Sequence, residues 1–171
     1  MRKVQAIVAA HEQCRDRMSR GGNRTYIRDG RAPVPKSEVT SRVMSANKAK
    51  DTKPELVLRQ ALRQVGIPGY RKHWKKAPGR PDVAYPSRKV AVFVHGCFWH
   101  RCPKCNFPLP KSNTEWWKSK FEKNRELDAR KTKALEEDGW KVFVIWECEI
   151  GANPTECALR IRAYADGTPQ T

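Results

Sequence analysis

Apolar residues recur at helical spacing in three segments of the chain and at strand spacing in three others. Leu58, Leu62 and Val65 lie one turn apart, and Thr52-Lys-Pro-Glu55 before them has the spacing of a capping box with proline in the first turn. In order, the pattern predicts a helix over 52–66, strands over 82–85 and 89–94, a helix over 112–138, a strand over 140–146 and a helix from 153.

The second helix and the last strand carry more specific expectations. Ser112 and Glu115 have capping-box spacing, and Gly139 is suited to end the helix that they open. Residues 140–146 are apolar on both faces, which is typical of an interior strand. The order of elements predicts an α/β fold with a small mixed central sheet flanked by helices, and it is also the order of the core of restriction-type endonucleases.

Charge and composition predict two regions in the chain and indicate the class of molecule that it binds. There are 35 Lys and Arg against 18 Asp and Glu in 171 residues, a formal net charge of +17 that favours a polyanion, nucleic acid above all. Glycines, prolines and scattered arginines predict a loosely ordered basic arm over 1–40 and a folded domain over 41–171. The apolar run 6–10 is too short for a signal-peptide core or a membrane span, so we expect a cytoplasmic protein without a membrane partner.

Four cysteines have the spacing of a zinc site. Cys97 precedes the knuckle formed by Cys102 and Cys105, and Cys148 follows the last predicted strand. Four thiolates complete a tetrahedral zinc site, and a reducing compartment favours metal binding over disulfides. We therefore predict a structural Zn²⁺ that ties the loop after residue 94 to the last strand.

Three residues close to this loop are candidates for catalysis. Asp82 opens a strand after Pro81, where a carboxylate can hold Mg²⁺ against a phosphate. His95 and His100 flank Cys97, and His100 is the better general base because an imidazole accepts a proton at neutral pH. Taken alone, Asp82 is better explained as a strand-opening or turn residue. His100 as a stray zinc ligand is the weaker explanation, because four cysteines already saturate zinc. Their combination favours the catalytic interpretation.

Several blocks of sequence, in the same order, resemble the very-short-patch-repair (Vsr) family of DNA mismatch endonucleases. The blocks are Ser41-Arg-Val-Met-Ser, Asp51-Thr-Lys-Pro-Glu55, Gly79-Arg-Pro-Asp82, His95-Gly-Cys-Phe-Trp-His100, Asn124-Arg-Glu-Leu-Asp128 and Gly139-Trp140 through Cys148. The resemblance covers about residues 41–150. It implies a restriction-endonuclease-like monomer that uses Mg²⁺ to nick one strand of double-stranded DNA beside a thymine–guanine mismatch, the product of 5-methylcytosine deamination.

The resemblance also implies roles for residues on the strand over 89–94 and beside it. Asp82 and the backbone oxygen of Val94 would bind Mg²⁺; the family usually has threonine at this second position, and a main-chain oxygen survives the change to valine. Many nucleases of this fold carry an acid and a lysine here in Glu-x-Lys spacing, whereas this chain has Phe93-Val94-His95. His95 would then replace the lysine near the scissile phosphate.

Two acids outside this strand complete the expected catalytic set. Asp128, on the long helix, matches the family's acid and would orient His100 through its second ring nitrogen, although a solvated helix charge is the simpler explanation of Asp128 alone. Glu55 is explained by its capping-box position, yet the resemblance implies that it binds a water on the metal.

Large aromatic residues are the expected source of mismatch selectivity. The resemblance points to Phe98, Trp99 and Trp117 as wedges between base pairs, with Trp116 in place of a second aromatic. A mismatch lowers the cost of unstacking that such insertion requires.

Two other functions remain open from the sequence. The chain could be a restriction-fold nickase with another DNA substrate, for instance in phage defence, or a zinc-containing DNA-binding module without catalysis. The module would keep its activity when Asp82 or His100 is replaced, whereas either nuclease would lose it.

Overall fold

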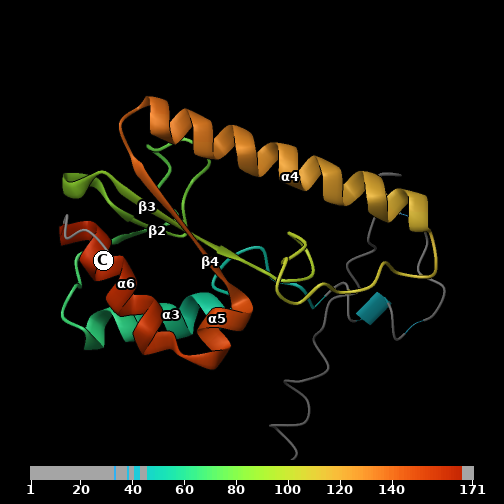
Figure 1. Cartoon of the computed structure of the whole chain (residues 1–171), viewed down its shortest axis with the longest axis horizontal. Coiled ribbons are helices and arrows are strands. Elements are labelled where there is room, and N and C mark those ends of the chain that lie inside the picture. The colour runs from blue at the N-terminus through green and yellow to red at the C-terminus, as the bar shows by residue number, and fades with distance from the viewer. Residues whose placement is uncertain (1–32, 34–37, 39–40, 43–45, 167–171) are drawn as a thin grey trace, which may run out of the picture. The chain divides into compact units, whose positions relative to one another are not determined.

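The computed structural model describes residues 33, 38, 41–42 and 46–166. Nearly all of the predicted arm over 1–40 lies outside these residues, so the arm stays a prediction. The chain after residue 50 forms one four-stranded mixed sheet between two layers of helices (Figure 1). No helix in the described part of the chain is long and apolar enough to span a membrane.

The sheet has the order β1-β2-β3-β4, and its strands are β1 (Arg71–Lys72), β2 (Val83–Tyr85), β3 (Val90–His95) and β4 (Lys141–Trp146). β2 is antiparallel to both β1 and β3, whereas β3 and β4 are parallel. In the parallel register Val94 lies opposite Ile145 and His95 opposite Trp146. Both strands therefore deliver their last residues to the same edge of the sheet.

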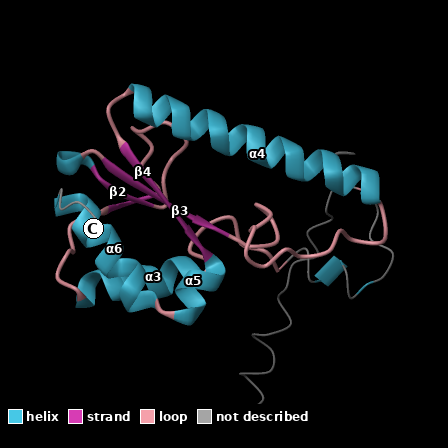
Figure 2. Cartoon of the chain, viewed as in Figure 1, coloured by secondary structure: helices cyan, strands magenta, loops and turns pink. Residues whose placement is uncertain are grey.

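Helices cover the two faces of the sheet, as Figure 2 shows by colour. They are α3 (Lys53–Gln64), α4 (Thr114–Glu137), α5 (Glu147–Ala152) and α6 (Pro154–Asp166), with a short 3-10 turn η1 (Pro86–Arg88) between β2 and β3. One face packs against α3, α5 and α6, and the other packs against α4.

The alternation of side chains along β3 explains this layering. Val90 and Val92 join the core with α3 and α6, while Ala91 and Phe93 join the smaller core under α4. Two more residues of alternation put Val94 against the first core and His95 on the face of α4. The strand thus fixes which helix each site residue meets.

Two expectations about these elements were wrong. β4 lies at the edge of the sheet in the described chain, not in its interior. Its apolar character reflects helices on both faces, and it says nothing about hydrogen-bonded neighbours. The expected Ser112–Glu115 capping box is also absent, since α4 begins one residue later with Asn113 as its N-cap, and Glu115 pairs with Lys118 at 2.8 Å.

The other predicted elements are confirmed to within a residue or two. Gly139 follows the end of α4 with φ +74°, a conformation that glycine adopts without strain. The short strand β1 and the helix α5 were not expected from the sequence.

Candidate active site and cysteine cluster

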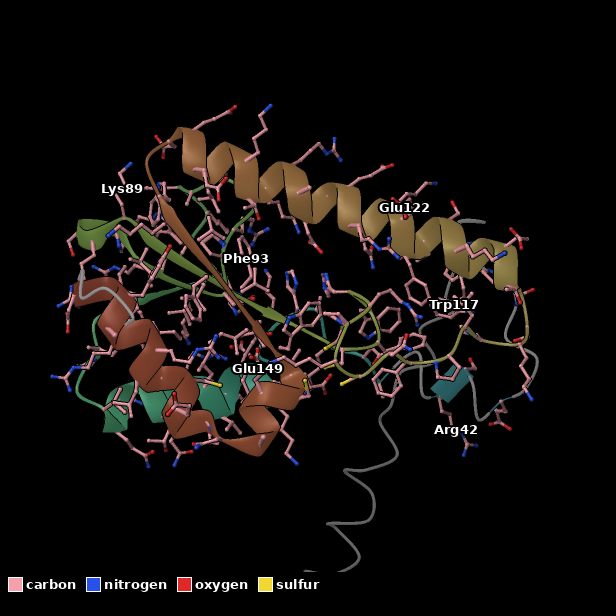
Figure 3. The ribbon with its side chains drawn as sticks, viewed as in Figure 1. Arg42, Lys89, Phe93, Trp117, Glu122 and Glu149 are labelled. Atoms are coloured by element: carbon pink, nitrogen blue, oxygen red, sulfur yellow. The ribbon has the colours of Figure 1, made fainter. Side chains whose placement is uncertain are left out.

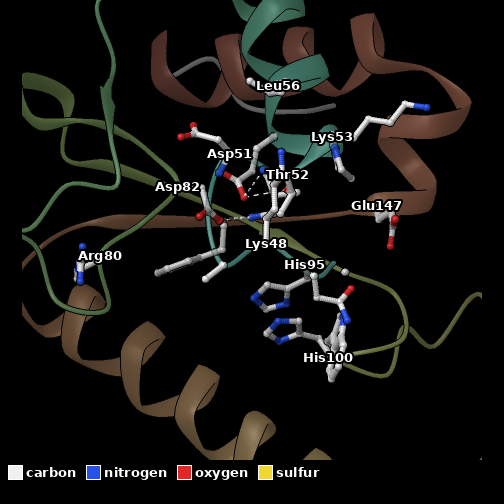
Figure 4. Close-up of a pocket in the computed structure, with 18 of the residues that line it drawn as sticks. Lys48, Asp51, Thr52, Lys53, Leu56, Arg80, Asp82, His95, His100 and Glu147 are labelled. Carbon is white, nitrogen blue, oxygen red and sulfur yellow. Dashed lines mark hydrogen bonds between the residues drawn. The ribbon is translucent and has the colours of Figure 1, made fainter. Parts of the chain in front are cut away.

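A collection of polar groups lies where β3 ends and α3 begins. A pocket there is lined by residues from the segment before α3, the loop before β2, the end of β3 and one face of α4 (Figure 4). The pocket holds Glu55, Asp82, His95, His100 and Asp128. The structure therefore brings the five expected catalytic residues into one pocket, and Val94 lines it too.

Glu55 is buried at the start of α3, with 5% of its surface exposed. Its carboxylate accepts backbone hydrogen bonds from Asp51 at 3.1 Å and Thr52 at 3.3 Å, and one from the Thr52 hydroxyl at 2.8 Å. The buried Arg59 guanidinium binds Asp51 at 2.5 Å and lies 3.8 Å from Glu55. The capping role of Glu55 is real, and it also holds the carboxylate in the pocket.

His73 is a functional candidate that the sequence did not reveal. Its Nε2 lies 3.5 Å from both Asp51 Oδ1 and Glu55 Oε2, and its Nδ1 lies 3.7 Å from Asp82 Oδ1. The His73 backbone N–H also donates to the Asp82 carbonyl at 3.3 Å. The pairing of β1 with β2 carries His73 to Asp82. β1 has only two residues, which is too short for the sequence pattern to predict it as a strand.

Asp82 stands just before β2 and faces the end of β3. Its Oδ2 accepts the Val94 backbone N–H at 2.8 Å. Burial raises the pKa of Asp82 to about 6, with the nearby Glu55 charge adding to the rise, while the Val94 N–H, His73 and Lys131 oppose it. A buried carboxylate with a raised pKa gains stability from an added cation.

The two histidines of the loop are stacked over each other. The ring centroids of His95 and His100 are 4.0 Å apart and the ring planes are inclined by 10°, so the two rings lie face to face (Figure 4). The rings of His95 and Trp146 meet edge to face, with their centroids 5.4 Å apart. Burial, and next the His100 charge, lower the pKa of His95 to about 4, so this ring is neutral at neutral pH.

His100 is held by an acid from α4. Its Nδ1 lies 2.5 Å from Asp128 Oδ2, and His95 Nε2 is 4.0 Å from the same oxygen. Burial raises the pKa of Asp128, but the hydrogen bond from His100 and the surrounding positive charges outweigh burial, so the pKa lies below its usual range. An ionised Asp128 can only accept, which makes Nδ1 the donor, and Nε2 is then the acceptor in the neutral ring of His100.

The four predicted zinc ligands form a separate cluster on the loop after β3 and at the start of α5. The sulfur atoms of Cys97, Cys102, Cys105 and Cys148 all lie within 4.8 Å of one another, and Cys102 and Cys148 are 3.8 Å apart. Tetrahedral zinc with Zn–S bonds near 2.3 Å requires sulfurs roughly 3.8 Å apart. The cysteine cluster therefore has the donor atoms and the spacing of a metal site.

Glu147 links this cluster to the pocket, and the sequence analysis did not single it out. Its carboxylate accepts the Cys97 backbone N–H at 3.1 Å, and the Cys148 N–H next to it points to Cys97 Sγ at 3.4 Å. Glu147 also lines the pocket. The loop that carries both histidines is thus fastened to the start of α5.

The expected wedge residues form an aromatic cluster between this loop and α4. The ring of Phe98 meets those of Trp99 and Trp117 edge to face, with centroids 5.3 Å apart in each pair. The ring centroids of Trp116 and Trp117 are 4.8 Å apart. Figure 3 shows Trp117 on the side of α4 that faces the loop. Trp117 is buried, with 7% exposed, whereas Trp99 lines the pocket and Asn124 holds its carbonyl at 2.9 Å.

Comparison with known proteins identifies the family. Residues 34–106 match the family described as DNA mismatch endonuclease Vsr. The chain is 44% identical to the Type II nicking enzyme V.XorIIP of Xanthomonas oryzae pv. oryzae over 63% of this chain and 79% of that protein. It is 43% identical to the Type II nicking enzyme V.NmeAIP of Neisseria meningitidis over 70% and 84% of the two chains.

A third relative carries the family name itself. The chain is 36% identical to the DNA mismatch endonuclease Vsr of Escherichia coli over 70% of this chain and 76% of that protein. Identities of this size across most of each relative's length, together with the family match, leave one conclusion. The chain belongs to the Vsr family of DNA mismatch endonucleases.

Proposed function

We propose that this protein is a DNA endonuclease that nicks one strand of double-stranded DNA at a thymine–guanine mismatch, with Mg²⁺ as the catalytic ion and Zn²⁺ as a structural ion. The observation that carries the proposal is the convergence of Asp82 with the His100–Asp128 pair in one pocket of a Vsr-family chain. The mixed sheet, with antiparallel β2 and β3 beside parallel β4, is consistent with a restriction-endonuclease-like core.

Asp82 and the backbone oxygen of Val94 are the proposed magnesium ligands, and Glu55 would hold a water on the ion. Hard cations take oxygen ligands and keep several waters, so one carboxylate and a few neutral oxygens suffice. The raised pKa of Asp82 supports this assignment because an ion at that carboxylate relieves the cost of its burial. When bound, Mg²⁺ would polarise the phosphate and acidify water.

His100 is the proposed general base. Asp128 holds its Nδ1, so Nε2 takes the proton from the water that attacks phosphorus as the bond to the leaving oxygen breaks. The ionised Asp128 then stabilises the imidazolium that forms. His95 is neutral at neutral pH and stacked on His100, which suits a role as a hydrogen-bonding partner of the phosphate and not as a second base.

The cysteine cluster is the proposed structural zinc site. The Cys97 and Cys148 contacts join the loop that carries His95 and His100 to the start of α5. Four cysteines saturate tetrahedral zinc, which leaves no position for substrate. Zinc here would organise the catalytic loop and take no part in the reaction.

DNA binding would combine phosphate contacts with aromatic insertion. Lys48, Lys53 and Arg80 line the pocket and are labelled in Figure 4. Phosphate contacts from a +17 protein are blind to sequence, so selectivity must come from elsewhere. Trp99 and Phe98, partly exposed beside the pocket, are the proposed wedges, and insertion of Trp117 would require the aromatic cluster to open.

The test is a nicking assay on duplexes labelled on either strand. We expect the purified protein to cut one strand of the mismatched duplex in Mg²⁺ and neither strand in EDTA. Nicking that persists in EDTA would exclude the metal assignment. Binding without any nicking under saturating Mg²⁺ would leave a DNA-binding module in place of an enzyme.

A further inference from the structure

β3 brings no lysine into the pocket, since its sequence is Val-Ala-Val-Phe-Val-His from residue 90 to 95. Of the cations close to the acids, Arg59 is already committed: it is buried and pairs with Asp51. Phosphodiester cleavage adds negative charge to the phosphate oxygens, and a fixed cation beside them lowers the barrier. The other cations that line the pocket are Lys48, Lys53, Arg80 and Lys131.

Lys131 reaches the pocket from α4, three residues after Asp128. Its Nζ lies 3.6 Å from Asp128 Oδ1, longer than a close ion pair, and 37% of the side chain is exposed. Lys131 lines the pocket with Asp82, His95 and His100. An ammonium held at this distance has donors left for a ligand that enters the pocket.

The stem of Lys131 lies directly over Gly79 in the turn before Asp82. A Cβ at Gly79 would stand 2.6 Å from Lys131 Cγ and 2.7 Å from its Cβ, closer than atoms can approach. The positive φ of +71° at Gly79 also favours glycine. The absence of a side chain at Gly79 therefore lets α4 bring Lys131 over the Asp82 turn.

Lys131 is among the positive charges that hold the pKa of Asp128 below its usual range. The ammonium therefore acts on the acid that orients the proposed base.

We propose that Lys131 contacts the phosphate at the nick and neutralises the charge that develops there, so that α4 supplies the lysine that β3 lacks. This inference rests on the proposed nicking activity and adds a residue to it. The rival role is purely one of positioning, in which Lys131 only holds Asp128 through the 3.6 Å ion pair.

The first test is Lys131→Met, which keeps the stem over Gly79 and removes the charge. Lys133→Met is the matched control, because Lys133 is 78% exposed on the same helix and pairs with Glu137 at 3.8 Å. In single-turnover nicking at saturating DNA and Mg²⁺, we expect Lys131→Met to be slower by roughly a hundredfold and Lys133→Met to match the wild type. We expect unchanged melting temperatures, and partial recovery in Lys131→Arg.

Equal rates for Lys131→Met and Lys133→Met would overturn the inference, while a wild type that does not nick would instead overturn the proposed function. If Lys131→Met melts lower, Lys131→Arg decides: a folded Arg variant with Met-like rates would mean that the charge is not what matters.

The second test separates phosphate contact from positioning. Binding in EDTA is measured on mismatched duplexes whose phosphate at the nick is replaced by an uncharged methylphosphonate. We expect the wild type and Lys133→Met to lose affinity for the modified duplex and Lys131→Met to lose clearly less. An equal loss in all three proteins, or none in the wild type, would mean that Lys131 does not contact that phosphate.

Discussion

The carboxylate cluster (Asp51, Glu55 and Asp82 around His73) and the cysteine cluster (Cys97, Cys102, Cys105 and Cys148) are organised in opposite ways. In the carboxylate cluster, most charges are already matched by protein groups: Arg59 binds Asp51, and backbone N–H groups bind Glu55. In the cysteine cluster, the four sulfurs lie within 4.8 Å of one another, and backbone N–H groups such as that of Cys148 also contact them. We therefore expect the carboxylate cluster to keep its shape when an ion leaves and the cysteine cluster to need its ion to stay together.

This difference matches two kinds of metal function. An exchangeable catalytic ion needs a site that is preorganised by the protein, because the ion arrives and leaves with substrate and waters. A structural ion contributes folding free energy itself. Asp82 is the exception within the carboxylate cluster, since burial raises its pKa to about 6, and it is where we expect the exchangeable ion to bind.

The largest effect is expected from breaking the cysteine cluster. Cys148→Ala should lose the zinc, melt far lower and lose all nicking, because zinc binding by such sets is worth on the order of 10 kcal/mol. Cys157→Ala is the control, since Cys157 is a buried free thiol in α6 outside the cluster. Metal analysis and thermal melting check both. Near-stoichiometric zinc in Cys148→Ala, or its absence from the wild type, would refute the assignment.

Asp82→Asn should separate activity from stability in the carboxylate cluster. Without the carboxylate, nicking should fall by roughly a thousandfold while DNA affinity stays close to that of the wild type, since the loss falls on the transition state. Without Mg²⁺ at pH 7.5, the melting temperature should rise and the free energy of unfolding should increase by on the order of 2 kcal/mol, because a buried charge with a raised pKa is removed.

His100→Gln is the companion variant, with slower nicking and no such gain in stability expected. Single-turnover kinetics and calorimetry measure the pair. An Asp82→Asn protein that nicks at the wild-type rate under saturating Mg²⁺ would contradict the catalytic assignment.

Metal binding should weaken with falling pH at the carboxylate cluster before it does so at the cysteine cluster. The folded pKa of Asp82 is raised above its unfolded value, so the folded state binds more protons between about pH 4 and 6, and this carboxyl lowers stability as pH rises through that window. Protons compete with Mg²⁺ for the same oxygen. Below pH 6, apparent Mg²⁺ affinity should fall by roughly tenfold per unit, and higher Mg²⁺ should restore occupancy of the site.

Titrations of nicking rate against Mg²⁺ at several pH values provide the measurement. The control is the zinc content, which should remain constant from pH 8 to 6. A Mg²⁺ requirement that does not change between pH 7 and 5 would indicate that Asp82 does not bind the ion.

The smallest effect is expected at the aromatic cluster. Trp99→Ala should reduce the preference for mismatched over matched DNA by roughly tenfold, because it removes a wedge whose insertion costs less at a mispaired step. Nonspecific binding at low salt should change little. Phe107→Ala is the control, an exposed aromatic on the loop beyond the cysteines. Competition binding checks both variants, and equal losses in both would remove the special role of Trp99.

What the sequence could predict depended on whether the signal was local. The cysteine knuckle, the Thr52–Glu55 capping spacing and the apolar run before His95 each lie within a few residues, and all three correspond to structure. His73 and Lys131 could not be found this way. His73 reaches Asp82 through a two-residue strand, and Lys131 reaches the pocket because Gly79 leaves room for a lysine stem from α4.

The roles of the aromatics illustrate the same limit. A tryptophan pair at the start of a charged helix suggests two exposed side chains, yet Trp117 is buried against Phe98 and Phe121. Burial of one ring of the pair depends on the path of the loop after β3. That path is fixed by contacts between residues about 50 positions apart, such as Cys97 with Glu147.

The most direct test of the central claim is a competition in one tube. Differently labelled thymine–guanine and fully matched duplexes of the same sequence are incubated with limiting protein at about 0.15 M salt, where nonspecific phosphate contacts are weakened. The mispair must lie in its preferred sequence, so a set of flanking bases is included. We predict that one strand of the mismatched duplex is nicked far faster than either strand of the matched duplex. Equal nicking of the two duplexes in every sequence context would contradict mismatch selectivity and leave a general nickase.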